Sequence, residues 1–393
     1  MRRFEKASDV IVLEFSAFSS ARGLYIAKAL SRARLSASLL TTRSVYIKRG
    51  VLKQDGIIRY LSTRCSQKLY SRLIGRLMYY VLFTLEATLR LLKYRPAVVY
   101  ARNVFAALAA VAYKVLAPST RVVLEISDLW PEAIAYLDAP PIFKSMLVKI
   151  GQLVNSGVYK HVDSLVAHNG VLASFIERRA RRRVRVLLGA VDLSKFRVMS
   201  VEEAEKGSGI VKRGFTILYA GLLGPFQNPL VIVEAARRLR GSGVVFMVVG
   251  TGPYRRVMER VAREEGLDLV LVDPQPHDRM PYIYNLADVC LMTYAETRFL
   301  SMGLPKKVVE YSACGKPILC VSPPCVASLL CEEWGAGIRV DPSDVEGFVK
   351  VILKLKCDER LRTRMGLNAR RMAEALFSPR RILEVVVKSV KRE

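Results

Sequence analysis

Residues 304–318 read LPKKVVEYSACGKPI, and this stretch says more about the fold than any other part of the chain. Pro305 suits the first turn of a helix, and the Gly-Lys-Pro sequence near the end stops a helix just before an apolar strand. Lys306 and Lys307 would lie in the first helical turn, where cations oppose the helix dipole. A bound diphosphate would explain them, and Glu310 one turn later is suited to accept hydrogen bonds from two adjacent hydroxyl groups. The alternative is an ordinary surface helix without a ligand.

Helix-to-strand steps of this kind recur along the chain, as short apolar runs rich in β-branched residues between longer helical patterns. This alternation is typical of parallel sheets covered by helices. In the first half we expect strands at residues 10–15, 37–41, 98–101, 121–126, 164–167 and 184–188. In the second half we expect strands at residues 215–220, 244–249, 269–272, 289–292, 318–321 and 337–340. Two such series predict an α/β fold with two doubly wound, Rossmann-like parallel-sheet domains.

The length of 393 residues suits two domains better than one. We assign residues 1–197 to the N-terminal domain and residues 215–375 to the C-terminal domain. Residues 198–214, VMSVEEAEKGSGIVKRG, are charged, contain Gly and Ser and lack sustained periodicity, so we expect an interdomain linker there. Residues 376–393 are expected to form a C-terminal helix, with a return to the N-terminal domain as one option.

Three glycine-containing turns follow predicted strands, at the sheet edge where doubly wound folds bind ligands. They are residues 220–224 with Gly221 and Gly224, residues 249–253 with Gly250 and Gly252, and less clearly residues 19–23 with Gly23. Glycine lets the backbone approach a phosphate, and the following helix offers free N–H groups. Neither half contains GxGxxG, which disfavours a nicotinamide-binding domain.

The charge is strongly positive and unevenly distributed. The chain has 62 Lys and Arg against 35 Asp and Glu, a net charge of +27. Residues 1–200 hold 33 basic and 12 acidic residues, a net charge of +21, which leaves +6 for the rest. This asymmetry predicts a polyanionic partner, and anionic lipid headgroups, phosphorylated lipids and nucleic acid are the candidates. Charge alone does not choose among them.

Two basic segments have alternative interpretations. Residues 68–93 form a helical pattern with apolar residues on one side, either a core-packing helix with solvated bases or an amphipathic helix on an anionic membrane. Residues 178–185, RRARRRVR, form either a solvated turn or a contact with the acceptor or the membrane.

The sequence also indicates a compartment. No segment has about 20 uninterrupted apolar residues, as a membrane span requires, and the charged N-terminus lacks the features of a secretory signal. The seven cysteines include no zinc-type or redox-type pair, which fits a reducing interior. We therefore expect a cytoplasmic protein. Asn and Gln together number only 11, a bias compatible with a heat-adapted organism.

The second half resembles the donor-binding domain of the GT-B fold, retaining glycosyltransferases of family 4. The matching segments are residues 219–224, 248–253, 285–289, 305–317, 335–341 and 377–378, in the order of the family. The first half is similar in fewer places, namely residues 94–103, 128–132 and 189–196. Residues 128–132 read DLWPE, which resembles the subgroup that assembles surface or lipid-linked glycans.

The resemblance implies transfer of a sugar from a nucleoside diphosphate sugar, with retention of configuration, in a cleft between the two domains. It implies no metal and no other cofactor. By position, Lys307 and Lys306 would bind the diphosphate and Glu310 the ribose, while Lys307 and Glu310 are also the catalytic candidates. The donor would further contact the glycine turns named above, Gln227, and the loop of Pro274 and Gln275 near the nucleobase.

Three departures from the family pattern matter. Met302 stands where the family usually has an acidic residue, eight positions before Glu310, so the sugar-hydroxyl contact of that residue cannot be carried over to this chain. Gln227-Asn228 replaces a common basic residue, which leaves more of the phosphate charge to the two lysines. Ser127-Asp128 stands where many members have a histidine. Asp128 would orient the acceptor hydroxyl or accept its proton, or it would only cap the helix at Pro131.

Together these features predict a glycosyltransferase, peripherally bound to the cytoplasmic membrane, that acts on a lipid-linked or other membrane-associated glycan. Two alternatives remain open. A nucleotide-sugar epimerase would share the fold, and an inactive nucleic-acid-binding protein would use the arginine cluster. Nucleic acid is the less favoured partner, because no aromatic residues interleave residues 178–185.

Overall fold

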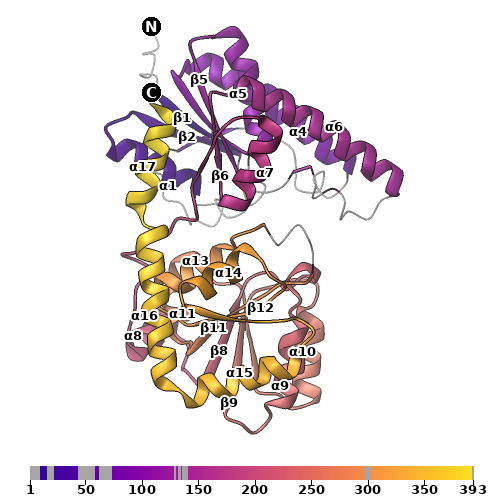
Figure 1. Cartoon of the computed structure of the whole chain (residues 1–393), viewed down its shortest axis with the longest axis vertical. Coiled ribbons are helices and arrows are strands. Elements are labelled where there is room, and N and C mark those ends of the chain that lie inside the picture. The colour runs from indigo at the N-terminus through magenta and orange to yellow at the C-terminus, as the bar shows by residue number, and fades with distance from the viewer. Residues whose placement is uncertain are drawn as a thin grey trace. The chain divides into compact units, whose positions relative to one another are not determined.

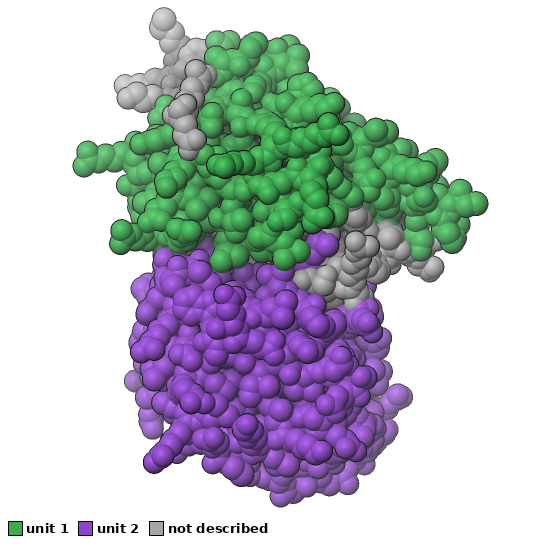
Figure 2. Space-filling view, in the orientation of Figure 1, with its two compact units in different colours: residues 1–188, 379–393 green, residues 189–378 purple. Residues whose placement is uncertain are grey.

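The computed structural model describes residues 9–15, 22–42, 58–61, 73–127, 130–131, 134, 140–296 and 302–391. The chain divides into two compact units (Figures 1 and 2). Unit 1 comprises residues 1–188 and 379–393, drawn in green in Figure 2, and unit 2 comprises residues 189–378, drawn in purple.

Unit 1 contains a seven-stranded parallel sheet in the order β3-β2-β1-β4-β5-β6-β7. Its strands are β1 (Val10–Glu14), β2 (Ala37–Thr42), β3 (Ile58–Leu61), β4 (Val98–Arg102), β5 (Arg121–Ile126), β6 (Ser164–Ala167) and β7 (Val184–Val186). Its helices are α1 (Arg22–Arg32), α4 (Leu73–Tyr94), α5 (Val104–Leu116), α6 (Pro141–His161), α7 (Gly170–Ala180) and α17 (Pro379–Val390).

Unit 2 contains a six-stranded parallel sheet in the order β10-β9-β8-β11-β12-β13. Its strands are β8 (Phe215–Ala220), β9 (Val244–Val249), β10 (Leu269–Val272), β11 (Val289–Thr293), β12 (Ile318–Val321) and β13 (Gly337–Val340). Its helices are α8 (Val201–Ser208), η2 (Pro225–Gln227), α9 (Leu230–Arg238), α10 (Arg255–Glu264), η3 (His277–Arg279), α11 (Met280–Asn285), α13 (Lys306–Ala313), α14 (Val326–Glu333), α15 (Val345–Cys357) and α16 (Glu359–Leu376).

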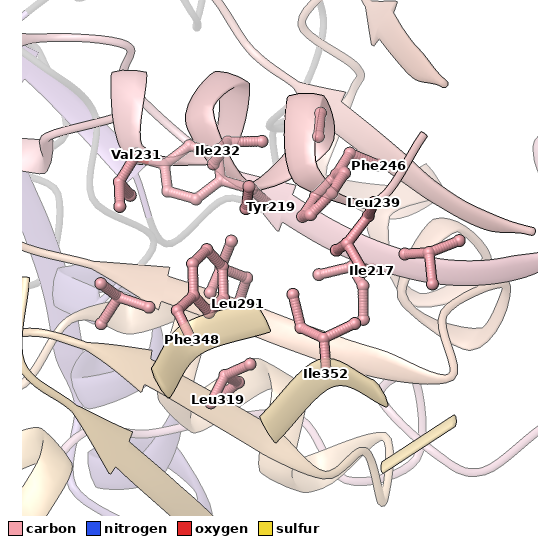
Figure 3. Packing of buried hydrophobic residues seen from close by; sticks show 14 of the residues in the cluster. Ile217, Tyr219, Val231, Ile232, Leu239, Phe246, Leu291, Leu319, Phe348 and Ile352 are labelled. Carbon is pink, nitrogen blue, oxygen red and sulfur yellow. The ribbon is translucent and has the colours of Figure 1, made fainter. Parts of the chain in front are cut away.

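The strand order of unit 2 reverses between β8 and β11, which is the topological switch point of a doubly wound sheet. Every residue of β8 is buried, as expected for a central strand with helices on both faces. In Figure 3, Ile217 of β8 and Leu291 of β11 pack in one apolar cluster with Phe348 and Ile352 of α15. This core fixes the two strands whose ends build the site described below.

The predicted strands are all present, and seven of the twelve have the predicted bounds. The edge strand β3 was not predicted. The stretch predicted as a linker, residues 198–214, instead lies within unit 2 and contains α8. Local capping explains this helix, because the Ser200 side chain accepts a hydrogen bond from the Glu203 N–H and Gly209 ends α8 at φ 68°.

The C-terminal segment returns to unit 1 after residue 378. Helix α17 packs against α1 and against β5, β6 and β7. Arg121 of β5 donates a hydrogen bond to the Ser389 carbonyl of α17 (3.1 Å). None of the helices in the described ranges is both long and apolar enough to cross a bilayer.

Candidate functional site

The N-terminus of α13 lies against the turn that follows β8, beside the switch point of unit 2. The Ala220 N–H at the end of β8 donates a hydrogen bond to the Tyr311 hydroxyl of α13 (2.9 Å). A Cβ atom added to Gly221, which has φ 142°, would lie 2.9 Å from the Lys307 ammonium nitrogen. The structure therefore brings together Gly221 and Lys307, which are far apart in the sequence.

The amino group of Lys307 is buried, although the residue as a whole is half-buried. Its ammonium nitrogen lies 3.8 Å from the centre of the Tyr219 ring and has no hydrogen-bond partner in the part of the chain that the structure describes. Burial lowers the pKa of Lys307 to about 7. An isolated buried charge is unfavourable, and a bound anion would compensate it.

Gln227 and Gly224 stand in the second part of the same turn. The side-chain carbonyl of Gln227 is buried and unpaired within the described ranges. A Cβ atom on Gly224 would lie 3.0 Å from that oxygen. Beside this turn, Gln227 is therefore a second polar side chain with an atom that no described residue hydrogen-bonds.

Gly250 and Gly252 support this turn through backbone packing. At Gly250, with φ 154°, a Cβ atom would lie 1.9 Å from the Gly221 carbonyl oxygen, and at Gly252 it would lie 2.4 Å from that of Leu223. The Leu223 N–H donates to the Thr251 carbonyl (2.9 Å). These contacts explain both glycines without a ligand, and their predicted contact with the donor stays a prediction.

Glu310, on the second turn of α13, is the centre of a polar cluster. Its carboxylate is buried and accepts a hydrogen bond from the Tyr284 hydroxyl (2.8 Å). His277 Nε2 lies 2.7 Å and Lys306 Nζ 3.0 Å from Glu310 Oε1. Burial alone would raise the pKa of Glu310, but Lys306 and His277 outweigh burial and hold the pKa below its ordinary value. The site therefore maintains a negative carboxylate in the second turn of α13.

The loop after β10 brings His277 to this cluster. Pro274 is exposed in the loop, and Gln275 Nε2 donates to the Asp273 carbonyl (3.1 Å). Among the described residues, neither of them hydrogen-bonds to Glu310, so their place near a nucleobase stays a prediction. Sequence reasoning missed His277 and Tyr284 as partners of Glu310. The one available signal was His277 itself, a histidine in the same loop as Pro274 and Gln275.

In unit 1, the predicted donor residue Gly23 has a clear packing role. A Cβ atom at this position would lie 2.2 Å from Glu14 Oε2 and 2.9 Å from a methyl carbon of Leu39. A larger residue at position 23 would therefore displace the ends of these two side chains, which explains the glycine by packing. A donor contact at Gly23 stays a prediction. Asp128 lies outside the described residues, so its catalytic role is likewise untested.

Sequence reasoning also missed a buried polar cluster around Glu125 at the end of β5. Glu125 accepts hydrogen bonds from Tyr100 (2.6 Å) and Arg22 (2.6 Å), and His168 Nε2 lies 3.0 Å from its Oε1. Burial would raise the pKa of Glu125, but Arg22 and Arg102 hold it well below its ordinary value. Burial, with help from Arg22, lowers the pKa of His168 to about 4, so His168 is neutral at pH 7. This cluster lies at the carboxyl ends of the central strands of unit 1.

A metal site is not indicated by any cluster in the described ranges, where no three His, Cys, Asp or Glu side chains gather around one point.

Residues 200–372 match the family described as Glycosyl transferases group 1. This match supports a relationship of unit 2 to that family of glycosyltransferases. It covers the turn after β8, α13 and the Glu310 cluster.

Two curated relatives match parts of the chain. The chain is 29% identical over 136 residues to a putative colanic acid biosynthesis glycosyl transferase, WcaI, of Escherichia coli, covering 34% of this chain and 33% of that protein. It is 28% identical over 213 residues to a D-inositol 3-phosphate glycosyltransferase of Thermomonospora curvata, covering 49% and 48%. The chain thus spans half or less of the length of these relatives.

Solved structures match the whole architecture. Anabaena HepE in complex with UDP has a TM-score of 0.74 at 14% identity and covers 97% of this chain and 99% of its own. At this identity the similarity concerns the fold, and the protein has the GT-B fold of two doubly wound parallel-sheet units. The DLWPE subgroup is not distinguished by these matches.

Proposed function

We propose that the protein is a retaining, metal-independent glycosyltransferase that moves a sugar from a nucleoside diphosphate sugar to a lipid-linked or other membrane-associated glycan. Unit 2 would bind the donor and unit 1 the acceptor. The donor class is supported by HepE, which was solved with UDP and with UDP-glucose. A role in glycan assembly is supported by WcaI, which is named for colanic acid biosynthesis, and by a further relative that is 22% identical over 170 residues, the O-antigen chain mannosyltransferase C of Escherichia coli.

The observation that carries this proposal is the unpaired, buried Lys307 ammonium beside Gly221. Burial removes the hydration of the Lys307 ammonium and lowers its pKa to about 7. A bound anion would stabilise the charged form in place of water. A diphosphate suits this position, since its negative charge grows as the sugar leaves. Stabilising that developing charge is usually the largest electrostatic contribution to such a transfer.

The remaining residues have defined tasks under this proposal. Lys306, half-exposed at the start of α13, would contact the outer phosphate oxygens. Glu310 would accept hydrogen bonds from the ribose hydroxyls through the lone pairs that Tyr284, His277 and Lys306 leave free. Asp128 would orient the acceptor hydroxyl, and the Gln227 amide would replace the basic residue common in the family.

The acceptor and location belong to the same proposal. A lipid-linked acceptor would bring the enzyme to the cytoplasmic face of the membrane, and the basic, apolar α4 supports peripheral attachment there. The scarcity of Asn and Gln supports a heat-adapted source.

Thermal stabilisation by nucleotides tests the donor site directly, because a ligand that binds only the folded state raises the melting temperature. We expect one of UDP, GDP and ADP to stabilise the wild type, and Lys307→Met and Glu310→Gln to remove most of the shift. Lys350→Met, an exposed lysine of α15, is the matched control and should retain it. Stabilisation by single-stranded DNA alone would overturn the proposal, while interconversion of two nucleotide sugars without acceptor would indicate an epimerase.

A further inference from the structure

Helix α6 of unit 1 has an outward face that no described element covers. Ile142, Met146, Ile150 and Leu153 follow one another at helical spacing, and Ile142 and Leu153 are 87% and 74% exposed. The residues that pack inward, Gly151, Asn155 and Val158, lie on the opposite side of the helix. Soluble proteins rarely leave such an apolar row exposed without a partner.

The charges of α6 indicate which partner fits. The helix contains three lysines, Lys144, Lys149 and Lys160, and no Asp or Glu. Helical spacing puts Lys149 and Lys160 on the same face as the apolar row. An apolar face bordered by lysines is typical of helices that lie in the headgroup region of an anionic membrane.

The arginine cluster of residues 178–185 continues this basic surface. The Arg182 guanidinium donates hydrogen bonds to the carbonyls of Tyr159 (3.0 Å), Val162 (2.6 Å) and Asp163 (2.9 Å) at the end of α6. Arg182 therefore has a structural role at the helix end, where it secures the cluster beside Lys160. Arg178, Arg181 and Arg183 remain exposed there.

The charge of unit 1 argues against a second copy as the partner. Unit 1 contains 36 Lys and Arg against 13 Asp and Glu, a net charge of +23, whereas unit 2 has 26 against 22, a net charge of +4. A symmetric contact through α6 would place lysines of the two copies opposite one another, and like charges in an interface are unfavourable. An anionic lipid surface offers the opposite sign over a large area.

We propose that the outward face of α6, together with Lys149, Lys160 and the arginine cluster, docks unit 1 on an anionic membrane, with α6 lying in the plane of the interface. The sequence pattern indicated residues 68–93 and the arginine cluster of residues 178–185 as candidate membrane contacts, so α6 adds a second and separate helix. This surface lies in unit 1, outside the donor site, and binding to lipid requires no nucleotide sugar. The proposal can therefore fail or hold independently of the donor assignment.

The test is flotation of the full chain with vesicles of phosphatidylcholine alone or mixed with phosphatidylglycerol. We expect the wild type to float only with the mixed vesicles. The double variant Ile150→Gln and Leu153→Gln should reduce the bound fraction on the order of tenfold, since it removes two large apolar side chains from the interface. The matched control replaces two exposed leucines of unit 2, Leu329→Gln and Leu367→Gln, and should bind like the wild type.

Several outcomes would overturn the proposal: no flotation of the wild type, unchanged flotation of the α6 variant, or an equal loss in the unit 2 control. Loss only in an α4 variant, Leu85→Gln and Leu89→Gln, would also overturn it by assigning docking to α4 alone. A wild-type dimer that the α6 variant converts to a monomer would identify a second copy as the partner. Unchanged nucleotide stabilisation of each variant shows that the fold and the donor site are intact.

Discussion

At the scale of single residues, Lys307 links burial to ligand binding. Its pKa of about 7 means that much of the free protein carries a neutral Lys307 at pH 8. A bound diphosphate favours the charged form and raises this pKa, so binding at pH 8 should take up close to one proton. Calorimetric titration with UDP, or with whichever nucleotide stabilises the protein, in buffers of different ionisation enthalpy measures this uptake.

The sign of the pH dependence follows from the same shift. As pH rises from 6 to 9, the free protein loses the Lys307 proton that the complex retains, so nucleotide affinity should fall over this range. Lys307→Met should show neither the uptake nor this fall, whereas Lys350→Met should show both. Equal proton uptake in Lys307→Met would remove Lys307 from the diphosphate site.

Tyr284 is a positioning residue for Glu310. Its hydroxyl donates to Glu310 Oε2 (2.8 Å), and Tyr284→Phe would leave that buried oxygen with one partner fewer. We expect a loss of about 1 to 2 kcal/mol in the free energy of unfolding, measured by urea denaturation. We also expect a higher KM for the donor, because the carboxylate is less firmly oriented. Tyr282→Phe, on the same helix α11, is the control, and a similar rise in KM there would contradict the assignment.

At the scale of elements, the pair of turns after β8 and β9 depends on close backbone contact. Gly250→Ala would put a methyl group 1.9 Å from the Gly221 carbonyl oxygen at φ 154°. We expect a destabilisation of about 3 kcal/mol or more, with loss of nucleotide binding, in thermal and urea unfolding. Gly241→Ala is the matched control, since Gly241 also has positive φ, 73°, but nothing within 4 Å. Gly241→Ala should lower the free energy of unfolding by about 1 kcal/mol. Equal destabilisation by the two variants would show that the positive φ, and not the close contact, sets the effect.

The elements also show what sequence patterns predict and where they stop. The β-branched runs predicted the strands because parallel strands are buried on both faces. The edge strand β3 was not predicted, although β10 and β13 are also four-residue edge strands and were. The spacing of Lys307 and Glu310 on α13 was enough to predict that both belong to one candidate site. Their partners could not, because His277 and Tyr284 are 33 and 26 residues away and meet Glu310 only through folding. Helix α8 was not predicted because its sequence signal lies in its capping residues, Ser200 and Gly209, and not in a helical repeat of apolar residues.

At the scale of the whole molecule, the uneven charge leads to a last prediction, on salt. The proposed membrane surface combines exposed lysines and arginines, which salt screens within about 8 to 10 Å, with an apolar row that salt does not weaken. Raising salt should therefore release the wild type from anionic vesicles only in part.

The α6 variant Ile150→Gln and Leu153→Gln should be released completely and at lower salt, because charge alone then holds it. The variant Lys149→Gln and Lys160→Gln should bind more weakly at low salt but depend less steeply on salt, since fewer counterions are exchanged. Flotation across a salt series measures all three, and identical salt curves for the three proteins would mean that α6 lies off the membrane.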